Sequence, residues 1–124
     1  MPQTEASPRQ RITLTINGQE FSLLLYDNEA ASAFSAMLPR TMAMTELHGN
    51  EKYFYVEGNL PTASQDVGQI SSGDLMLYGD NCVVLFYESF STTYRYTPLG
   101  RVEDPSGLAE AVGQGDVDVT FSAP

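Results

Sequence analysis

The alternation of apolar and polar residues near the start of the chain predicts a β-hairpin. From residue 11 to residue 16 every second side chain is apolar, namely Ile12, Leu14 and Ile16. This two-residue period is typical of a half-buried strand. Asn17-Gly18 follows and favours a two-residue turn, because both central residues of that turn have positive φ. Apolar positions return at Phe21, Leu23 and Leu25, which predicts the partner strand.

Further strands are predicted wherever short apolar or alternating runs lie between turn residues. They cover residues 40–47, 52–56, 75–78, 82–87, 94–101 and 117–121. The segment Cys82 to Phe86 is apolar at every position. We therefore expect this strand to be covered on both faces.

Two helices are predicted, one early and one late. Asp27-Asn28-Glu29 supplies a capping side chain and a first-turn acid. An apolar stripe at helical spacing follows, formed by Ala30, Ala33, Phe34, Met37 and Leu38. Pro39 ends this helix. The second begins at Asp104-Pro105, with proline at the first helical position, and ends at Gly113.

The number and order of these elements predict a mainly β domain, a closed eight-stranded β-barrel with two capping helices. Closure removes exposed strand edges, and a β-sandwich is the alternative architecture. The 124 residues suit one domain. We expect residues 1–10 to be a disordered lead-in and residues 11–122 to form the barrel. The predicted core includes Ile12, Leu14, Phe34, Leu75, Leu85, Phe86 and Val119.

Several segments, taken together and in order, are similar to a known family. They are Tyr26-Asp27-Asn28, Gly73-Asp74-Leu75-Met76-Leu77-Tyr78-Gly79, Leu85-Phe86-Tyr87, Leu99-Gly100-Arg101-Val102 and Asp104-Pro105-Ser106-Gly107-Leu108. With them the chain resembles bacterial and archaeal cyclophilin-like-fold domain proteins over roughly residues 11–122. The resemblance implies a closed eight-stranded cyclophilin-like barrel with two capping helices.

The resemblance assigns no catalytic residue. Eukaryotic-type cyclophilins isomerise X-Pro bonds with an arginine just after a Phe-His pair, and they carry an Asn-Gly-Ser-Gln-Phe-Phe segment. Neither string occurs in this sequence, where the single histidine, His48, stands between Leu47 and Gly49. A fold without the motif is only an analogy for function.

Composition limits the partners that we expect. Lys and Arg number 6 against 16 Asp and Glu, which gives a formal net charge of −10. A nucleic acid or an anionic membrane surface needs clustered cations, so neither is expected. We expect the acidity to keep the protein soluble and monomeric. No apolar leader is visible, so the expected location is cytoplasmic.

Few residues carry the pattern of a catalytic or metal site. Glu46 and His48 would share a face if their strand continued, as a general base pair requires, but a solvated hairpin end is the simpler interpretation. Cys82 lies in an apolar run and is expected to be a buried, unreactive thiol. One His and one Cys cannot form a structural zinc site, so we predict no metal and no cofactor.

Aromatic residues carry the functional hypothesis. If some rings point away from the barrel, they could form an apolar groove for a peptide or small molecule. Its candidate ligand-binding residues are Arg40, Tyr53, Tyr55, Tyr78, Phe90 and Tyr94. The competing interpretation is that the rings fill the core or pack under the helices, with the arginines considered for the groove, Arg40, Arg95 and Arg101, in ion pairs. The preferred function is a non-enzymatic binding module, and the alternative is a divergent peptidyl-prolyl cis-trans isomerase.

Overall fold

The computed structural model describes residues 10–124. All of the predicted lead-in except Gln10 lies outside the described residues. Gln10 itself is connected to the domain, because its backbone carbonyl accepts a hydrogen bond from the Leu25 N–H at 2.8 Å. Its side-chain oxygen accepts another from Ser35 Oγ at 2.9 Å.

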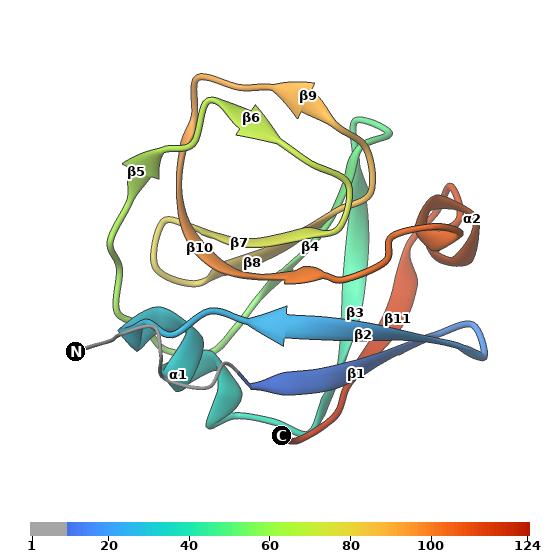
Figure 1. The fold of residues 1–124 in the computed structure, drawn as a ribbon, viewed down its shortest axis with the longest axis horizontal. Coiled ribbons are helices and arrows are strands. Elements are labelled where there is room, and N and C mark those ends of the chain that lie inside the picture. The colour runs from blue at the N-terminus through green and yellow to red at the C-terminus, as the bar shows by residue number, and fades with distance from the viewer. Residues whose placement is uncertain (1–9) are drawn as a thin grey trace.

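Eight antiparallel strands form a closed barrel (Figure 1). Around the barrel they follow the order β2-β1-β11-β3-β4-β8-β7-β10, and pairing of β10 with β2 closes the ring. Their bounds are β1 Arg11–Ile16, β2 Gln19–Leu25, β3 Arg40–Leu47, β4 Glu51–Tyr55, β7 Asp74–Tyr78, β8 Cys82–Phe86, β10 Arg95–Val102 and β11 Val117–Phe121. The predicted mainly β, closed eight-stranded architecture is confirmed.

The first hairpin forms as its sequence pattern predicts. β1 pairs with β2 from Arg11 opposite Leu24 to Ile16 opposite Gln19. Asn17 and Gly18 connect them with φ of 50° and 80°. The apolar residues of β1 are buried, and their threonine neighbours are partly exposed. The two-residue period therefore sets both the register and the inward face of this hairpin.

Among the described residues, three short strands lie outside the ring, in segments between the predicted strands. β5 (Gln65–Asp66) pairs with β10, and β6 (Gln69–Ile70) pairs with β9 (Phe90–Ser91). Figure 1 shows the segments that carry β6 and β9 arching away from β7, β8 and β10. Two connections that are far apart in the sequence thus form one layer over the outside of the barrel.

This layer explains why the structure has two apolar clusters. The main core fills the barrel, and its members include every predicted core residue except Phe86. A second cluster lies on the other face of the same strands and consists of Ile70, Met76, Cys82, Val84, Phe86 and Tyr96. Every residue of β8 is buried because Val83 and Leu85 join the first cluster while its other residues join the second. All seven predicted core residues are buried.

Residues 10–124 contain two helices, and both are shorter than predicted. Helix α1 covers Glu29–Ser35, and the Asn28 side chain accepts a hydrogen bond from the Ala31 N–H at its start. Its last turn tightens, with Met37 N–H bonded to the Phe34 carbonyl. Helix α2 covers Leu108–Val112 and ends at Gly113 as predicted. Figure 1 places the helices on opposite sides of the barrel, and each contributes apolar residues to the main core.

Candidate binding groove

Outward-facing residues of neighbouring strands form rows on the outside of the barrel. On β4, Tyr53 packs against the second cluster, and Phe54, its neighbour, packs against the main core. Strand pairing sets Tyr55 opposite Cys82 and Cys82 opposite Tyr78. The side chains of these three residues therefore lie side by side on β4, β8 and β7, and face away from the barrel interior.

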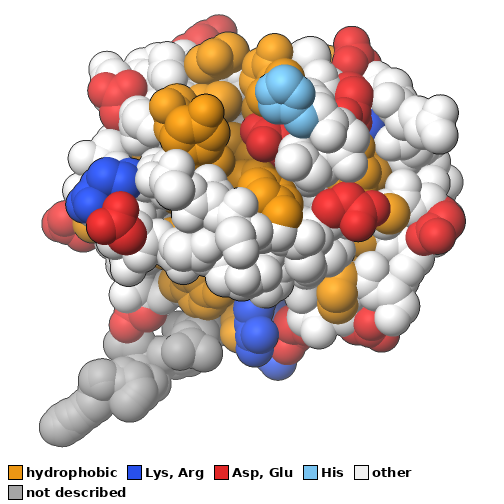
Figure 2. Space-filling view, turned by 90° about the horizontal axis from the view of Figure 1, so that it is seen from above, with side chains coloured by type: hydrophobic (Ala, Val, Ile, Leu, Met, Phe, Trp, Pro, Cys, Tyr) orange, Lys and Arg blue, Asp and Glu red, His pale blue; other side chains and the backbone are white. Residues whose placement is uncertain are grey.

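A groove of about 300 Å³ lies over these rows. We call it the tyrosine groove. It is lined by Leu47, His48, Glu51, Tyr53, Tyr55, Tyr78, Cys82, Val84, Tyr94 and Tyr96. Tyr55, Tyr78 and Tyr94 are 62%, 48% and 63% exposed. Figure 2 shows this side of the molecule, with hydrophobic and acidic side chains gathered near the pale-blue histidine. The tyrosines thus form an accessible aromatic surface that also carries hydroxyl groups.

The tyrosine rings meet at steep angles. The Tyr53 and Tyr55 centroids are 5.7 Å apart at an interplanar angle of 74°, and those of Tyr78 and Tyr94 are 6.1 Å apart at 72°. Tyr78 also contacts Tyr96, at 5.6 Å and 57°. Rings packed edge to face are favourable because the positive edge of one meets the negative face of another. Here the arrangement produces adjoining walls instead of a flat stack.

Glu51 gives the groove a negative character. It is the only acidic residue among the lining residues, which include no Lys or Arg. Partial burial raises the pKa of its carboxyl group, His48 opposes this shift and Glu46 adds to it. Within residues 10–124, no side-chain hydrogen bond or ion pair is found for its carboxylate. Among the described residues, Glu51 is therefore a partly desolvated acid without an ion-pair partner.

Cys82 forms part of the floor of the groove but is poorly suited to nucleophilic chemistry. Burial raises the pKa of its thiol to about 11, and the nearby Glu51 adds to this effect, while a hydrogen bond with Tyr55 opposes it. Only a thiolate is an effective nucleophile. The thiol is protonated at neutral pH, as its position in an apolar run predicts.

A second hollow of about 420 Å³ adjoins the groove. It shares His48, Glu51, Tyr94 and Tyr96 with the groove and adds Asn50, Phe90, Ser91, Thr92 and Thr93. The Asn50 amide oxygen is buried and has no hydrogen-bond donor among the described residues. The groove therefore continues into a more polar region rich in hydroxyl groups.

Four of the six predicted ligand-binding residues meet in one place. Tyr53, Tyr55, Tyr78 and Tyr94 line the tyrosine groove, and Phe90 lines the adjoining hollow. The expectation that Arg40 shares this site is corrected, because it lines neither. Its guanidinium instead lies 5.1 Å from the centroid of the Phe54 ring. Arg40 begins β3, at the opposite end of the strand from Leu47, and so points toward a different part of the barrel.

The other arginines considered for this site are also elsewhere. Arg95 forms an ion pair with Asp66 at 3.2 Å and donates to the Ser64 carbonyl at 2.8 Å. Arg101 is exposed and lines neither hollow. Sequence reasoning missed Glu51 and Tyr96. Glu51 lies two residues before Tyr53 and four before Tyr55 on β4, so alternation places it on their face. The position of Tyr96 depends instead on how β10 pairs with its neighbours.

Glu46 and His48 do not form a catalytic pair. The strand ends at Leu47, and His48 lies in the turn with φ of 58°. The Glu46 carboxylate already accepts hydrogen bonds from Lys52 Nζ at 2.8 Å, Tyr87 Oη at 2.6 Å and the Gly49 N–H at 2.6 Å. It therefore has a structural role, not that of a free base.

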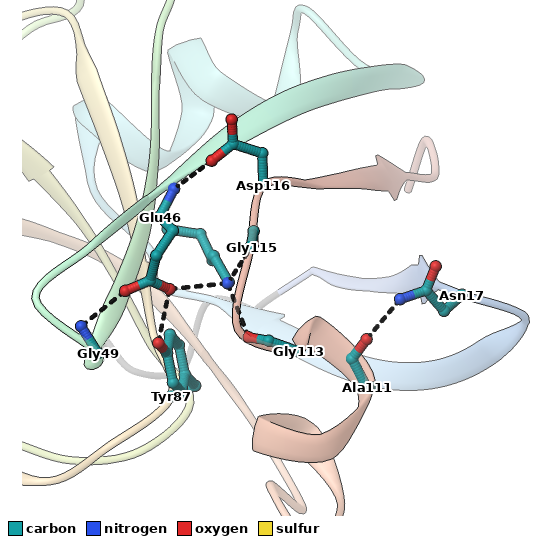
Figure 3. A network of polar contacts seen from close by, with 9 residues as sticks. Asn17, Glu46, Gly49, Tyr87, Ala111, Gly113, Gly115 and Asp116 are labelled. Carbon is teal, nitrogen blue, oxygen red and sulfur yellow. Dashed lines mark hydrogen bonds and ion pairs between the residues drawn. The ribbon is translucent and has the colours of Figure 1, made fainter.

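These contacts belong to a polar network at one end of the barrel (Figure 3). Lys52 is fully buried and donates to the carbonyls of Gly113 and Gly115 as well as to Glu46. The Asp116 side chain accepts from the Glu46 N–H at 2.9 Å. The network thus attaches the segment after α2 to the β3–β4 hairpin. The sequence feature that indicates this network is a pair of charged residues, Glu46 and Lys52, at inward positions of adjacent strands.

Within residues 10–124, no group of three or more His, Cys, Asp or Glu residues could hold a metal ion. No described helix is long and apolar enough to cross a membrane.

The model of the family described as the cyclophilin-like family matches residues 14–122, nearly all of the described chain. A search of curated proteins found nothing that matches.

Proposed function

This chain belongs to the cyclophilin-like family, and we propose that it is a non-enzymatic binding domain that holds a small molecule or peptide in the tyrosine groove. Membership establishes the kind of domain but not an activity, since one fold serves many functions. The proposal is therefore argued from the groove.

One observation carries the proposal: five tyrosines from three separate parts of the chain converge on an open concave surface. Three of the groove residues are between 48% and 63% exposed, although large side chains with mainly apolar surface are usually buried to a greater extent. Ligand sites are typically concave and aromatic with a few polar groups. The groove has these properties, with hydroxyl groups and one carboxylate among its lining residues.

The alternative, a divergent prolyl isomerase, has less support. That hypothesis requires an arginine beside an apolar pocket. None of the three candidate arginines lines the tyrosine groove, and Arg40 and Arg95 have partners elsewhere. No observation among the described residues supplies another electrophile in this position.

The test is a fragment and short-peptide screen followed by ¹⁵N–¹H correlation NMR of the full chain. We expect bound compounds to shift resonances of Tyr53, Tyr55, Tyr78 and Tyr94. Tyr94→Ala should weaken binding without unfolding the protein, because the ring is 63% exposed. Arg40→Ala is the control, since Arg40 lies outside the groove, and it should bind like the wild type.

Two results would contradict the proposal. One is the absence of any compound that shifts groove resonances in a protein verified as folded. The other is a protease-coupled assay that shows prolyl isomerisation above background and loses it in Arg40→Ala or Arg101→Ala.

A further inference from the structure

The chemistry of the tyrosine groove indicates what class of ligand it accepts. We propose that its occupant is a small molecule that carries a quaternary ammonium group. This inference rests on the proposed binding function and specifies the ligand for the same groove.

The aromatic walls provide the first argument. Five tyrosines line the groove, and the angles of 74° and 72° between neighbouring rings set their faces as adjoining walls. The face of an aromatic ring has a negative electrostatic potential and attracts a cation within about 6 Å of its centroid. A cation between such walls interacts with more than one ring, which is how aromatic cages recognise quaternary ammonium groups.

Charge provides the second argument. Glu51 is half-buried and has no ion-pair partner among the described residues, so a bound cation would compensate it. His48 is the only basic residue among those that line the groove. The formal net charge of −10 adds a general attraction for cations and repels anions. An anionic ligand would meet Glu51 without a balancing Lys or Arg.

Size and hydrogen-bonding capacity distinguish between cations. At about 300 Å³, the groove is at the lower end of the usual range for ligand sites, roughly 300–1,000 Å³. A primary ammonium group has three N–H donors and is strongly hydrated, and Glu51 is the only carboxylate among the residues that line the groove. A quaternary ammonium group has no N–H to satisfy and binds to apolar ring faces at less desolvation cost. The groove therefore suits the quaternary group better.

The experiment compares choline with 3,3-dimethylbutan-1-ol, its neutral isostere of nearly equal shape. Both are titrated into the full chain at pH 8, where imidazole side chains are normally uncharged, and binding is followed by NMR. We expect choline to shift groove resonances and to bind about tenfold more tightly than the alcohol, a ratio typical of a partly desolvated cation–π site. Butylammonium, a primary ammonium probe, should bind more weakly than choline.

Variants distinguish the contribution of the Glu51 charge to choline binding from that of the aromatic rings. Glu51→Gln should reduce the preference for choline over the alcohol, whereas Glu20→Gln, which removes an equal charge from an exposed site on β2, should not. Tyr94→Phe should keep choline binding because the ring remains. Tyr94→Leu should weaken it.

The outcomes distinguish this inference from the proposed function. If choline and the alcohol bind equally, or if butylammonium binds more tightly than choline, the quaternary-ammonium inference is wrong and the binding groove stands. If other fragments bind in the groove but choline does not, the quaternary-ammonium inference is again wrong and the proposed binding function stands. If no compound shifts the groove resonances, both proposals fail.

Discussion

At the scale of single residues, the charged groups of this domain fall into two kinds, those with partners and those without. Lys52 is completely buried yet donates three hydrogen bonds, one of them to a carboxylate. Glu51, next to it in the sequence, points to the other face of the sheet and has no such partners. Adjacent residues on one strand thus contribute oppositely to stability.

Glu51→Gln should stabilise the protein at pH 7. Partial burial raises the pKa of the Glu51 carboxyl group, so its ionised form costs stability in the folded state above that pKa. The cost disappears as the pH falls below the ordinary value of 4.5, because the group is then protonated in both states. Urea unfolding at pH 7 should show a gain of about 0.5–2 kcal/mol, and at pH 4 a smaller gain. Equal gains for the control Glu20→Gln would show that general charge repulsion is responsible.

Lys52→Met should destabilise the domain severely. The substitution leaves Glu46 without its cation and two backbone carbonyls without a donor, and breaking a buried ion pair costs about 3–5 kcal/mol. The matched control is Arg95→Met, because the Arg95 pair with Asp66 is exposed on both sides and such pairs contribute about 0–1 kcal/mol. Equilibrium unfolding of both variants is the measurement. A similarly small decrease in the free energy of unfolding of both variants would mean that the Lys52 network is not essential for stability.

At the scale of the elements, the barrel depends on how closely β10 and β2 approach. Gly100 pairs with Leu25 on one side and Leu75 on the other, next to a register shift at Pro98. A Cβ at Gly100 would lie 2.5 Å from the Leu24 carbonyl oxygen. Only glycine allows the backbones to meet here without displacement.

Gly100→Ala should therefore weaken the closure of the barrel. The new methyl group contacts backbone that cannot rotate away, and overpacking of this kind costs about 1–3 kcal/mol. Gly115→Ala is the control, because nothing lies within 4 Å of its added Cβ and its carbonyl remains available to Lys52. Thermal unfolding should show a lower Tm for the first variant and little change for the second. Unchanged Tm in Gly100→Ala would mean that β2 and β10 can separate at no cost.

At the scale of the whole molecule, one exposed ion pair connects the first strand of the barrel to the segment that follows β10. Arg11 on β1 donates two hydrogen bonds, at 2.7 and 2.9 Å, to Glu103, which directly follows β10. Ser22 on β2 also donates to Glu103. Three segments that form the closure of the barrel are thus connected by one carboxylate.

This arrangement predicts an acid-dependent loss of stability. Hydrogen bonds from Arg11 and Ser22 lower the pKa of Glu103 to about 2. A lowered folded-state pKa contributes stability above the ordinary value of 4.5, and this contribution is lost as the pH falls toward 2. Glu103→Gln should lower the Tm at pH 7, and its difference from the wild type should shrink between pH 4.5 and pH 2. A difference that is constant with pH would exclude the carboxylate as the cause.

Much of the fold follows from local pattern. The alternation in residues 11–25 with Asn17-Gly18, the all-apolar run from Cys82 to Phe86 and the stop at Gly113 each predict the element found there. Both helices are shorter than the pattern predicts, because the tightening of the last turn of α1 and the positive φ of Gly107 before α2 depend on packing and on the neighbouring segments of the chain.

What the sequence determined by itself was therefore the strand order along the chain, the inward and outward faces, and the presence of outward aromatic residues. These follow from a two-residue period, which needs no knowledge of partners. Only the tertiary structure decided which rings share a groove, that Arg40 lies over Phe54 instead, and that Lys52 is a buried ion-pair residue. The physical reason is that these contacts join residues far apart in the sequence. They depend on strand order and register around a closed barrel, which local spacing does not specify.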